Sequence, residues 1–167
     1  DTAGIRATED KLEKMGIENY IVDIGGEVRC KGVNKKGLAW RVGVETPFEG
    51  NQSNGDYIQQ VISLSNYSMA TSGNYRNYYE KDGKKFAHTI DPRTGYPIQH
   101  NILSSTVLAQ DCATADAYAT AFMVLGLEEA QKILNEKHDL MAFFIYSNEN
   151  GEMEKWHTEN LNNLIVK

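Results

Sequence analysis

One loop of this chain gathers hydrogen-bonding and charged side chains at a density that suits a ligand better than a protein core. Within seven residues it includes His88, Asp91, Arg93 and Thr94. Pro92 and Pro97 fix the backbone φ angle in this stretch, and Gly95 permits turns that other residues resist. Taken alone, His88 favours a structural role. Its combination with the loop makes it a candidate catalytic residue.

A second candidate lies on a helix predicted over Cys112–Leu125. Asp116 and Thr120 are four residues apart, so they share one face of this helix, one turn apart. A carboxylate and a hydroxyl are hard oxygen donors, suited to Mg²⁺ and phosphate. The alternative also stands: Asp116 is a solvated acid on an amphipathic helix, and Thr120 bonds to its own helix backbone.

Composition and charge limit the class of protein. The 167 residues fit one domain spanning 1–167, with 41% hydrophobic and 24% charged residues. The net charge of −6, without a dense Lys/Arg stripe, argues against a nucleic-acid partner. No apolar run reaches the roughly 18 residues of a membrane span, and residue 1 begins no signal-peptide pattern.

The two cysteines, Cys30 and Cys112, have neither the spacing of a metal site nor that of a disulfide framework. A disulfide between them stays open on sequence grounds. The interpretation we favour is two buried free thiols.

Alternating and apolar runs predict strands at Tyr20–Ile24 and Glu27–Lys31, separated by Gly25-Gly26. A double glycine inside a strand pattern indicates either a β-bulge or the close approach of a ligand or another backbone. Both interpretations stay open. A further strand is predicted at 38–45, with Leu38, Trp40, Val42 and Val44 on one face.

The rest of the chain follows the same plan. Asp82-Gly83 predicts a hairpin turn between 74–80 and 84–90, after a polar loop at 46–55. Helices are predicted at 8–15, Cys112–Leu125 and 127–137, with Asp111 as N-cap and Gly126 as stop for the second. Further strands are predicted at 57–64, 103–108 and 140–146. Sequential hairpins with inserted helices predict an α+β fold with a mostly antiparallel sheet and packed helices.

Four motifs in order make the chain resemble one family. They are VDIGGE (22–27), TSGNY (71–75), HTIDPRTGYP (88–97) and DCATADAYATAFMVLG (111–126). They resemble the FAD:protein FMN transferases, the flavin transferases of the ApbE family, whose fold is a T-fold-like α+β unit. The resemblance implies a Mg²⁺-dependent enzyme that splits FAD, attaches FMN through a phosphoester bond to a Thr or Ser of a target flavoprotein, and releases AMP.

The same resemblance implies roles for single residues. Asp116 and Thr120 match the metal-binding pair, and His88 matches the histidine that assists proton transfer at the hydroxyl nucleophile. Ile90 with its neighbours Asp91, Arg93 and Thr94 would line the flavin-nucleotide site, and Gly25 and Gly26 would lie near it. Arg93 has two interpretations, steadying phosphate charge or pairing with Asp91. Family members often sit in the bacterial cell envelope or periplasm, which is the expected location.

The chain departs from the family in its length, because family members are about twice as long. The resemblance therefore implies the C-terminal half of such an enzyme, in which Asp1 to Ile5 match the start of a further family motif that Arg6 and Ala7 do not continue. Three alternatives stay open beside the transferase: a Mg²⁺-dependent FAD pyrophosphatase, a non-catalytic flavin-nucleotide-binding module, and an inert structural fragment.

Overall fold

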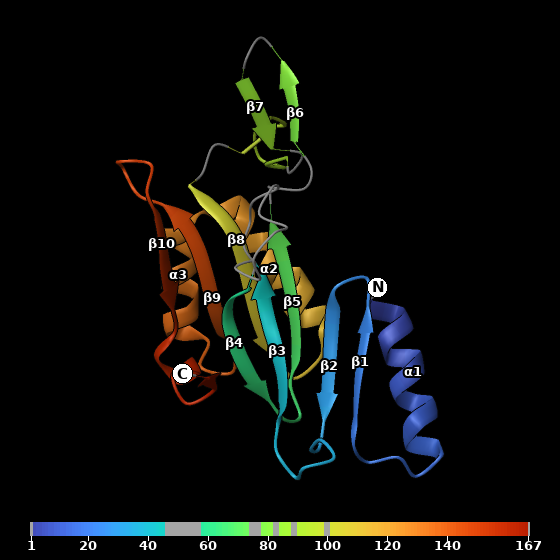
Figure 1. Ribbon diagram of the computed structural model, residues 1–167. Helices are drawn as coiled ribbons and strands as arrows, with labels where there is room; N and C mark the ends of the chain where they lie inside the picture. Colours follow the sequence, from blue (N-terminus) through green and yellow to red (C-terminus); the bar gives the residue numbers. More distant parts are fainter. Residues whose placement is uncertain are drawn as a thin grey trace.

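The computed structural model describes residues 2–45, 58–73, 78–81, 84–87, 90–98 and 101–166, and in 78–81 and 84–87 the backbone alone. It confirms an α+β fold with mostly antiparallel strands (Figure 1). The elements are α1 (Thr2–Lys14), β1 (Tyr20–Ile24), β2 (Glu27–Lys31), β3 (Trp40–Glu45), β4 (Ile58–Leu64), β5 (Ser68–Gly73), β6 (Tyr78–Lys81), β7 (Lys84–Ala87), β8 (Ile102–Ala109), α2 (Cys112–Leu125), α3 (Leu127–Glu136), β9 (Met141–Ser147), β10 (Met153–His157), a 3₁₀ turn (Glu159–Leu161) and β11 (Ile165–Val166).

The main body has three layers around one six-stranded sheet. The strand order is β1-β2-β5-β8-β9-β10, and each neighbouring pair is antiparallel. Helices α2 and α3 cover one face of this sheet, and a smaller sheet in the order β11-β4-β3 covers the other (Figure 1). α1 lies beside β1 and also contacts β2 and α2.

Because both faces of the central strands are covered, successive side chains enter two different cores. Phe144 and Val107 pack under the helices with Ala115, Ala119 and Phe122. Phe143 and Leu108 point the other way, into the core shared with Ile62 and Leu64 of the smaller sheet. This two-sided burial explains why β9 reads as a continuous apolar run rather than an alternating one.

The Gly25-Gly26 pair forms the turn of the β1–β2 hairpin, so of the two interpretations left open the β-bulge is wrong. Ile24 pairs directly with Glu27, which leaves only the two glycines in the loop. Their φ angles are 71° and 101°. Two-residue hairpin turns that match the strand twist require positive φ at central positions, which glycine adopts without strain. The pattern was that of two strands joined by the shortest common hairpin loop.

The predicted caps of α2 are confirmed. The Asp111 carboxylate accepts a hydrogen bond from the Thr114 backbone N–H at 2.9 Å and another from the Thr114 hydroxyl at 2.7 Å. The bond from the backbone is the main cause that lowers the pKa of Asp111. Gly126 ends the helix with a φ of 83°. α1, by contrast, begins at Thr2, earlier than predicted, and its buried residue Ile5 ties this first turn to the body.

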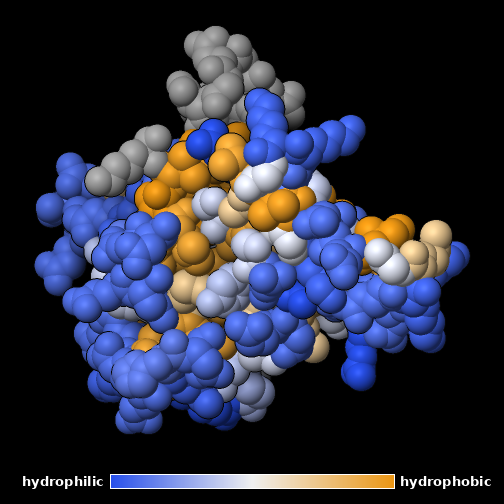
Figure 2. All heavy atoms as spheres, turned by 90° about the horizontal axis from the view of Figure 1, so that it is seen from below, coloured by the Kyte–Doolittle hydropathy of each residue, from blue (hydrophilic) through white to orange (hydrophobic). Residues whose placement is uncertain are grey.

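The lower end of the molecule exposes hydrophobic side chains among hydrophilic ones (Figure 2). The end of α1 and the β2–β3 connection contribute Met15, Val33 and Leu38, of which Leu38 is 60% exposed. The prediction that Leu38 shares the buried face of Trp40, Val42 and Val44 is therefore wrong, because β3 begins only at Trp40. The predicted hairpin is present as β6 and β7, while its turn at 82–83 and the polar loop at 46–55 lie outside the described residues.

Both cysteines are buried free thiols, as predicted. Burial raises the pKa of the Cys30 thiol to about 12, and it also raises the pKa of Cys112. Both side chains therefore stay protonated at neutral pH. Among the described residues, none of the helices has the length and apolar character needed to cross a bilayer.

Gly32, at the end of β2, closes a tight junction of three segments. Its N–H donates to the Asn66 side-chain oxygen at 3.1 Å, and its carbonyl accepts from the Ser65 hydroxyl at 2.8 Å. With a φ of +60°, a Cβ atom on this residue would stand 2.1 Å from Asn19 Oδ1 and 2.8 Å from the Glu18 carbonyl oxygen. Glycine is therefore required here for space as well as for conformation.

We expect Gly32→Ala to lower the free energy of unfolding by roughly 2–4 kcal/mol, since left-handed strain and overpacking add. Gly37→Ala is the matched control, because Gly37 also has positive φ (+72°) but a Cβ would meet nothing within 4 Å. The control should cost about 1 kcal/mol from strain alone. Urea unfolding measures both, and equal losses would show that space at Gly32 is not limiting.

Candidate functional site

Asp116 and Thr120 lie where the sequence placed them, on one side of α2 and one turn apart. Ala115 and Ala119 face the central sheet and are fully buried, whereas Asp116 is half-buried and Thr120 exposed. The Thr120 hydroxyl lies 2.9 Å from the hydroxyl of Ser72 in β5. No hydrogen bond or ion pair occupies the Asp116 carboxylate within the described part of the chain.

Ser72 is a further residue that the sequence alone does not single out, although the motif at 71–75 contains it. Ser72 pairs with Ser105 of β8 in the strand register. The Ser105 hydroxyl is buried and makes no hydrogen bond in the described ranges. Hydroxyl groups from two strands and one helix therefore gather beneath this side of α2.

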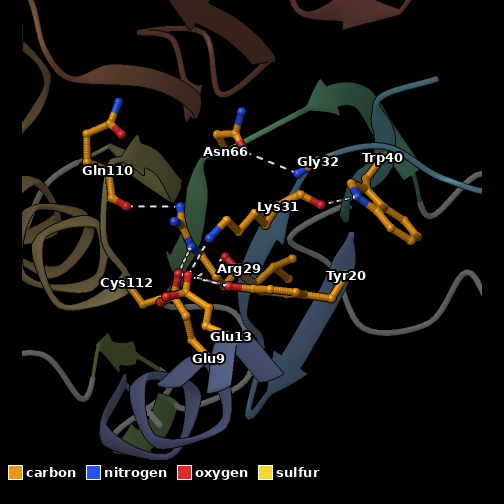
Figure 3. Close-up of polar contacts among 11 residues, drawn as sticks. Glu9, Glu13, Tyr20, Arg29, Lys31, Gly32, Trp40, Asn66, Gln110 and Cys112 are labelled. Atoms are coloured by element: carbon orange, nitrogen blue, oxygen red, sulfur yellow. Dashed lines mark hydrogen bonds and ion pairs between the residues drawn. The ribbon is translucent and has the colours of Figure 1, made fainter. Parts of the chain in front are cut away.

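The first turn of α2 is fixed to β2. Arg29 Nη1 donates to the Gln110 carbonyl oxygen at 3.0 Å, and Arg29 Nε donates to Glu9 of α1 at 2.8 Å (Figure 3). The Cys112 thiol donates to the Val28 carbonyl oxygen at 3.5 Å. Consecutive residues of β2 thus hold the start of the helix that carries Asp116 and Thr120.

The same network extends from Glu9 and binds α1 to the β1–β2 hairpin. The Tyr20 hydroxyl donates to Glu9 at 3.1 Å, and Lys31 pairs with Glu13 (Figure 3). Burial and the hydrogen bond to Glu9 raise the pKa of Tyr20, while the bond from Lys31 lowers the pKa of Glu13. Two acidic residues of α1, Glu9 and Glu13, therefore face two basic residues of β2, Arg29 and Lys31.

The loop at 90–98 is held together by its own polar groups. Asp91 is nearly buried, and its carboxylate accepts from the Arg93 backbone N–H at 2.9 Å and from Arg93 Nη2 at 2.8 Å. Of the two interpretations for Arg93, the structure contains the ion pair with Asp91, which raises the pKa of the guanidinium. Thr94 closes the turn by accepting from the Tyr96 N–H at 3.3 Å, and Ile90 bridges to Pro97.

The end of the loop packs against α2 beyond Thr120. Ile98, at the end of the loop, packs on Met123 and Val124, the turn of α2 that follows Thr120. Ile90 is 47% exposed. Gly25 and Gly26 are exposed at the hairpin turn. His88 lies outside the described residues, so its prediction stays untested.

The donor chemistry of the α2 pair fits Mg²⁺. This ion is usually held by one or two carboxylates, with substrate phosphates and waters completing its octahedron. Asp116 offers a carboxylate, and Thr120 a hydroxyl. The described residues contain no group of three or more His, Cys, Asp or Glu side chains around a common point. Oxygens beyond these two would come from a phosphate substrate, from water or from other parts of the protein.

Comparison with known proteins identifies relatives over most of the chain. The model of the ApbE family matches residues 4–144. An FAD:protein FMN transferase from Haemophilus influenzae is 43% identical over 152 residues, which cover 91% of this chain and 43% of that protein. The Escherichia coli K12 protein of the same name is 37% identical over 155 residues, or 93% of this chain and 42% of its own length.

Solved structures agree with the sequence relatives. The flavin transferase ApbE from Vibrio cholerae superposes with a TM-score of 0.80 at 34% identity, covering 98% of this chain and 50% of that chain. The apo form of the Pseudomonas stutzeri flavinyl transferase ApbE gives a TM-score of 0.79 at 32% identity and covers 98% and 48%. This chain spans less than half the length of the curated relatives it matches. By family match, sequence identity and fold, the chain belongs to the ApbE family.

Proposed function

We propose that this chain carries part of the active site of an FAD:protein FMN transferase. The reaction splits FAD at its pyrophosphate, joins FMN through a phosphoester bond to a Thr or Ser of a target flavoprotein, and releases AMP. The observation that carries the proposal is the pair Asp116 and Thr120 on α2, in a chain 43% identical to a relative of that name.

The residues of α2 have a defined part in this proposal. Asp116 and Thr120 would hold Mg²⁺ through their oxygens. When bound, Mg²⁺ supplies charge neutralisation at the pyrophosphate oxygens. The two side chains would keep that charge at a fixed position on a rigid helix, which β2 anchors at its first turn.

The proposed reaction forms one phosphorus–oxygen bond and breaks another. The acceptor hydroxyl oxygen attacks the phosphorus on the FMN side, and the bond to the AMP oxygen breaks, so that AMP leaves. His88 would accept the hydroxyl proton, since the unperturbed pKa of histidine, about 6.5, suits a base at neutral pH. Arg93 keeps a 63% exposed side chain despite its bond to Asp91, so its outer N–H groups remain accessible to a phosphate.

In this proposal the loop at 90–98 contacts the flavin nucleotide. Exposed Ile90 offers an apolar surface, and the Asp91–Arg93 pair and Thr94 keep the loop in one shape. A preorganised loop lowers the entropy cost of binding. Gly25 and Gly26, without side chains, would let a nucleotide approach the β1–β2 turn closely.

The test is incubation of the chain with FAD and Mg²⁺, with and without a target flavoprotein that presents an unmodified acceptor threonine. AMP is followed by chromatography and the flavoprotein by mass spectrometry. We expect AMP only with the acceptor, together with a mass gain of FMN minus water, and neither product when EDTA removes Mg²⁺.

Each other outcome points to a different function. AMP without the acceptor would identify the pyrophosphatase, in which water replaces the hydroxyl. FAD bound but left intact would identify the binding module. Failure to bind FAD would contradict a flavin site within this chain, and the same assay on a protein of the relatives' full length would then locate the missing part.

A further inference from the structure

The contact between Ser72 and Thr120 joins two elements that the strand ladders do not connect. Ser72 lies in β5 and Thr120 in α2, and their hydroxyl oxygens are 2.9 Å apart. Ala70 packs under the helices, and alternation along β5 puts Ser72 on the same face. Ser72 is half-buried, whereas Thr120 is exposed, so the contact leaves one side of the Thr120 hydroxyl open.

The number of hydrogen bonds that a hydroxyl can donate and accept restricts how Thr120 can act as a metal ligand. A hydroxyl has one proton to donate and two lone pairs to share. If Thr120 accepts from Ser72, one lone pair is consumed and the proton must be directed elsewhere. If Thr120 donates to Ser72, its proton is satisfied and its lone pairs are free for a cation.

We propose that Ser72 is a positioning residue. It accepts a hydrogen bond from the Thr120 hydroxyl and so turns the lone pairs of the Thr120 oxygen toward the bound cation. The inference rests on the proposed function, in which Thr120 is a Mg²⁺ ligand. Outer partners of this kind orient metal ligands, and their loss typically costs 10- to 100-fold in metal affinity.

Ser105 supports this direction of the hydrogen bond. As an acceptor from Thr120, Ser72 must donate its own proton to another group. Ser105 stands opposite Ser72 in the register, and its buried hydroxyl has no hydrogen bond within the described residues. Directly paired positions place Cβ atoms about 5 Å apart, so a side-chain rotation brings the two hydroxyls within reach.

The neighbouring residue offers a matched control. Thr71 bonds to the hydroxyl of Thr106 at 2.9 Å, the same distance as Ser72 to Thr120. Its partner is a strand residue, however, and lies on the opposite face of the sheet from α2. Loss of either hydroxyl removes one hydrogen bond from β5, but only Ser72 contacts the helix that carries the candidate ligands.

The experiment measures the Mg²⁺ dissociation constant by isothermal titration calorimetry, with Mn²⁺ binding by electron paramagnetic resonance as a second readout. We expect Ser72→Ala to weaken binding by about 10- to 100-fold, and Ser72→Thr, which keeps the hydroxyl, to stay within about 3-fold of the parent. Thr71→Ala should lower the melting temperature, because it leaves Thr106 buried without a partner, and should not change the dissociation constant. If Ser72→Ala does not fold, Ser72→Cys, of similar volume, takes its place in the test and should likewise weaken Mg²⁺ binding.

The outcomes separate this inference from the proposed function. If Asp116→Ala weakens Mg²⁺ binding but Ser72→Ala does not, Ser72 is not a positioning residue, and the site stands. Equal changes for Ser72→Ala and Thr71→Ala would also overturn the inference, because packing of β5 would then explain both. If neither the parent chain nor Asp116→Ala binds Mg²⁺, both the inference and the α2 metal site are wrong.

Discussion

Asp116→Asn should lower AMP release by roughly 100- to 1,000-fold, the loss typical when one preorganised group that stabilises transition-state charge is removed. Asparagine keeps the shape of the side chain but carries no negative charge. A neutral amide oxygen holds Mg²⁺ far more weakly than a carboxylate, so less of the pyrophosphate charge is neutralised. The assay is AMP release from FAD at a fixed Mg²⁺ concentration, repeated at higher Mg²⁺ to test for partial recovery.

The fold should not respond to this change. In the described part of the chain the Asp116 carboxylate bonds to nothing, so the substitution removes no internal hydrogen bond. Asp111→Ala on the same helix is the opposite case, because it removes the N-cap and should cost about 1 kcal/mol of stability with little effect on AMP release. An Asp116→Asn protein that turns over normally would rule out α2 as the metal site.

The cap also gives a pH dependence of stability. The pKa of Asp111 is lowered in the folded protein, so the cap contributes stability above the unfolded value of about 3.9. That contribution is lost as the pH falls through the lowered folded value. The Asp111→Ala protein should therefore differ from the parent at pH 7 and approach it in stability under strongly acidic conditions.

Arg29→Met should lower the free energy of unfolding by roughly 2–4 kcal/mol, somewhat less than the 3–5 kcal/mol typical of breaking a fully buried ion pair. The Arg29 and Glu9 side chains are 13% and 23% exposed, so solvent screens the pair only in part. Methionine fills a similar volume but cannot donate hydrogen bonds. The Glu9 carboxylate then keeps its bond from the Tyr20 hydroxyl but loses its ion pair, and the Gln110 carbonyl oxygen loses the Arg29 donor. Urea unfolding of the two proteins gives the difference directly.

Arg41→Met is the matched control for charge and composition. Arg41 is exposed on β3 and has no ion pair among the described residues, so its loss should change stability by no more than about 0.5 kcal/mol. If Arg29→Met and Arg41→Met unfold at the same urea concentration, the contact between α1, β2 and α2 is not important for stability.

Local signals explain what the sequence predicted well. The bounds of β1, β2 and α2 were read correctly from apolar runs, the Asp111 cap and the Gly126 stop. The Gly25-Gly26 pair leaves two interpretations open in the sequence, although two residues between paired strands already satisfy a hairpin. The start of α1 was missed because residues 2–7 carry a single buried apolar side chain, Ile5.

The site was predicted only as far as single elements allow. The spacing of Asp116 and Thr120 within one helix is visible in the sequence, and so is the loop around Asp91. Their partners are not: Ser72 lies 48 residues from Thr120, and Arg29 lies 81 residues from Gln110. Such contacts depend on the strand order, which periodicity does not encode. The role of His88 and the location in the cell envelope stay predictions.

The smaller sheet has a consequence for how the chain folds. Ile165 of β11 pairs with Ile62 of β4, a separation of 103 residues (165 − 62). β11 is an edge strand of the smaller sheet, which covers one of the two cores. Pairing across so long a loop is slow, and folding dominated by such contacts takes milliseconds to seconds. During synthesis about a hundred further residues must be made before β11 can pair with β4. Until then Ile62 and Leu64 stay exposed and prone to misassociation.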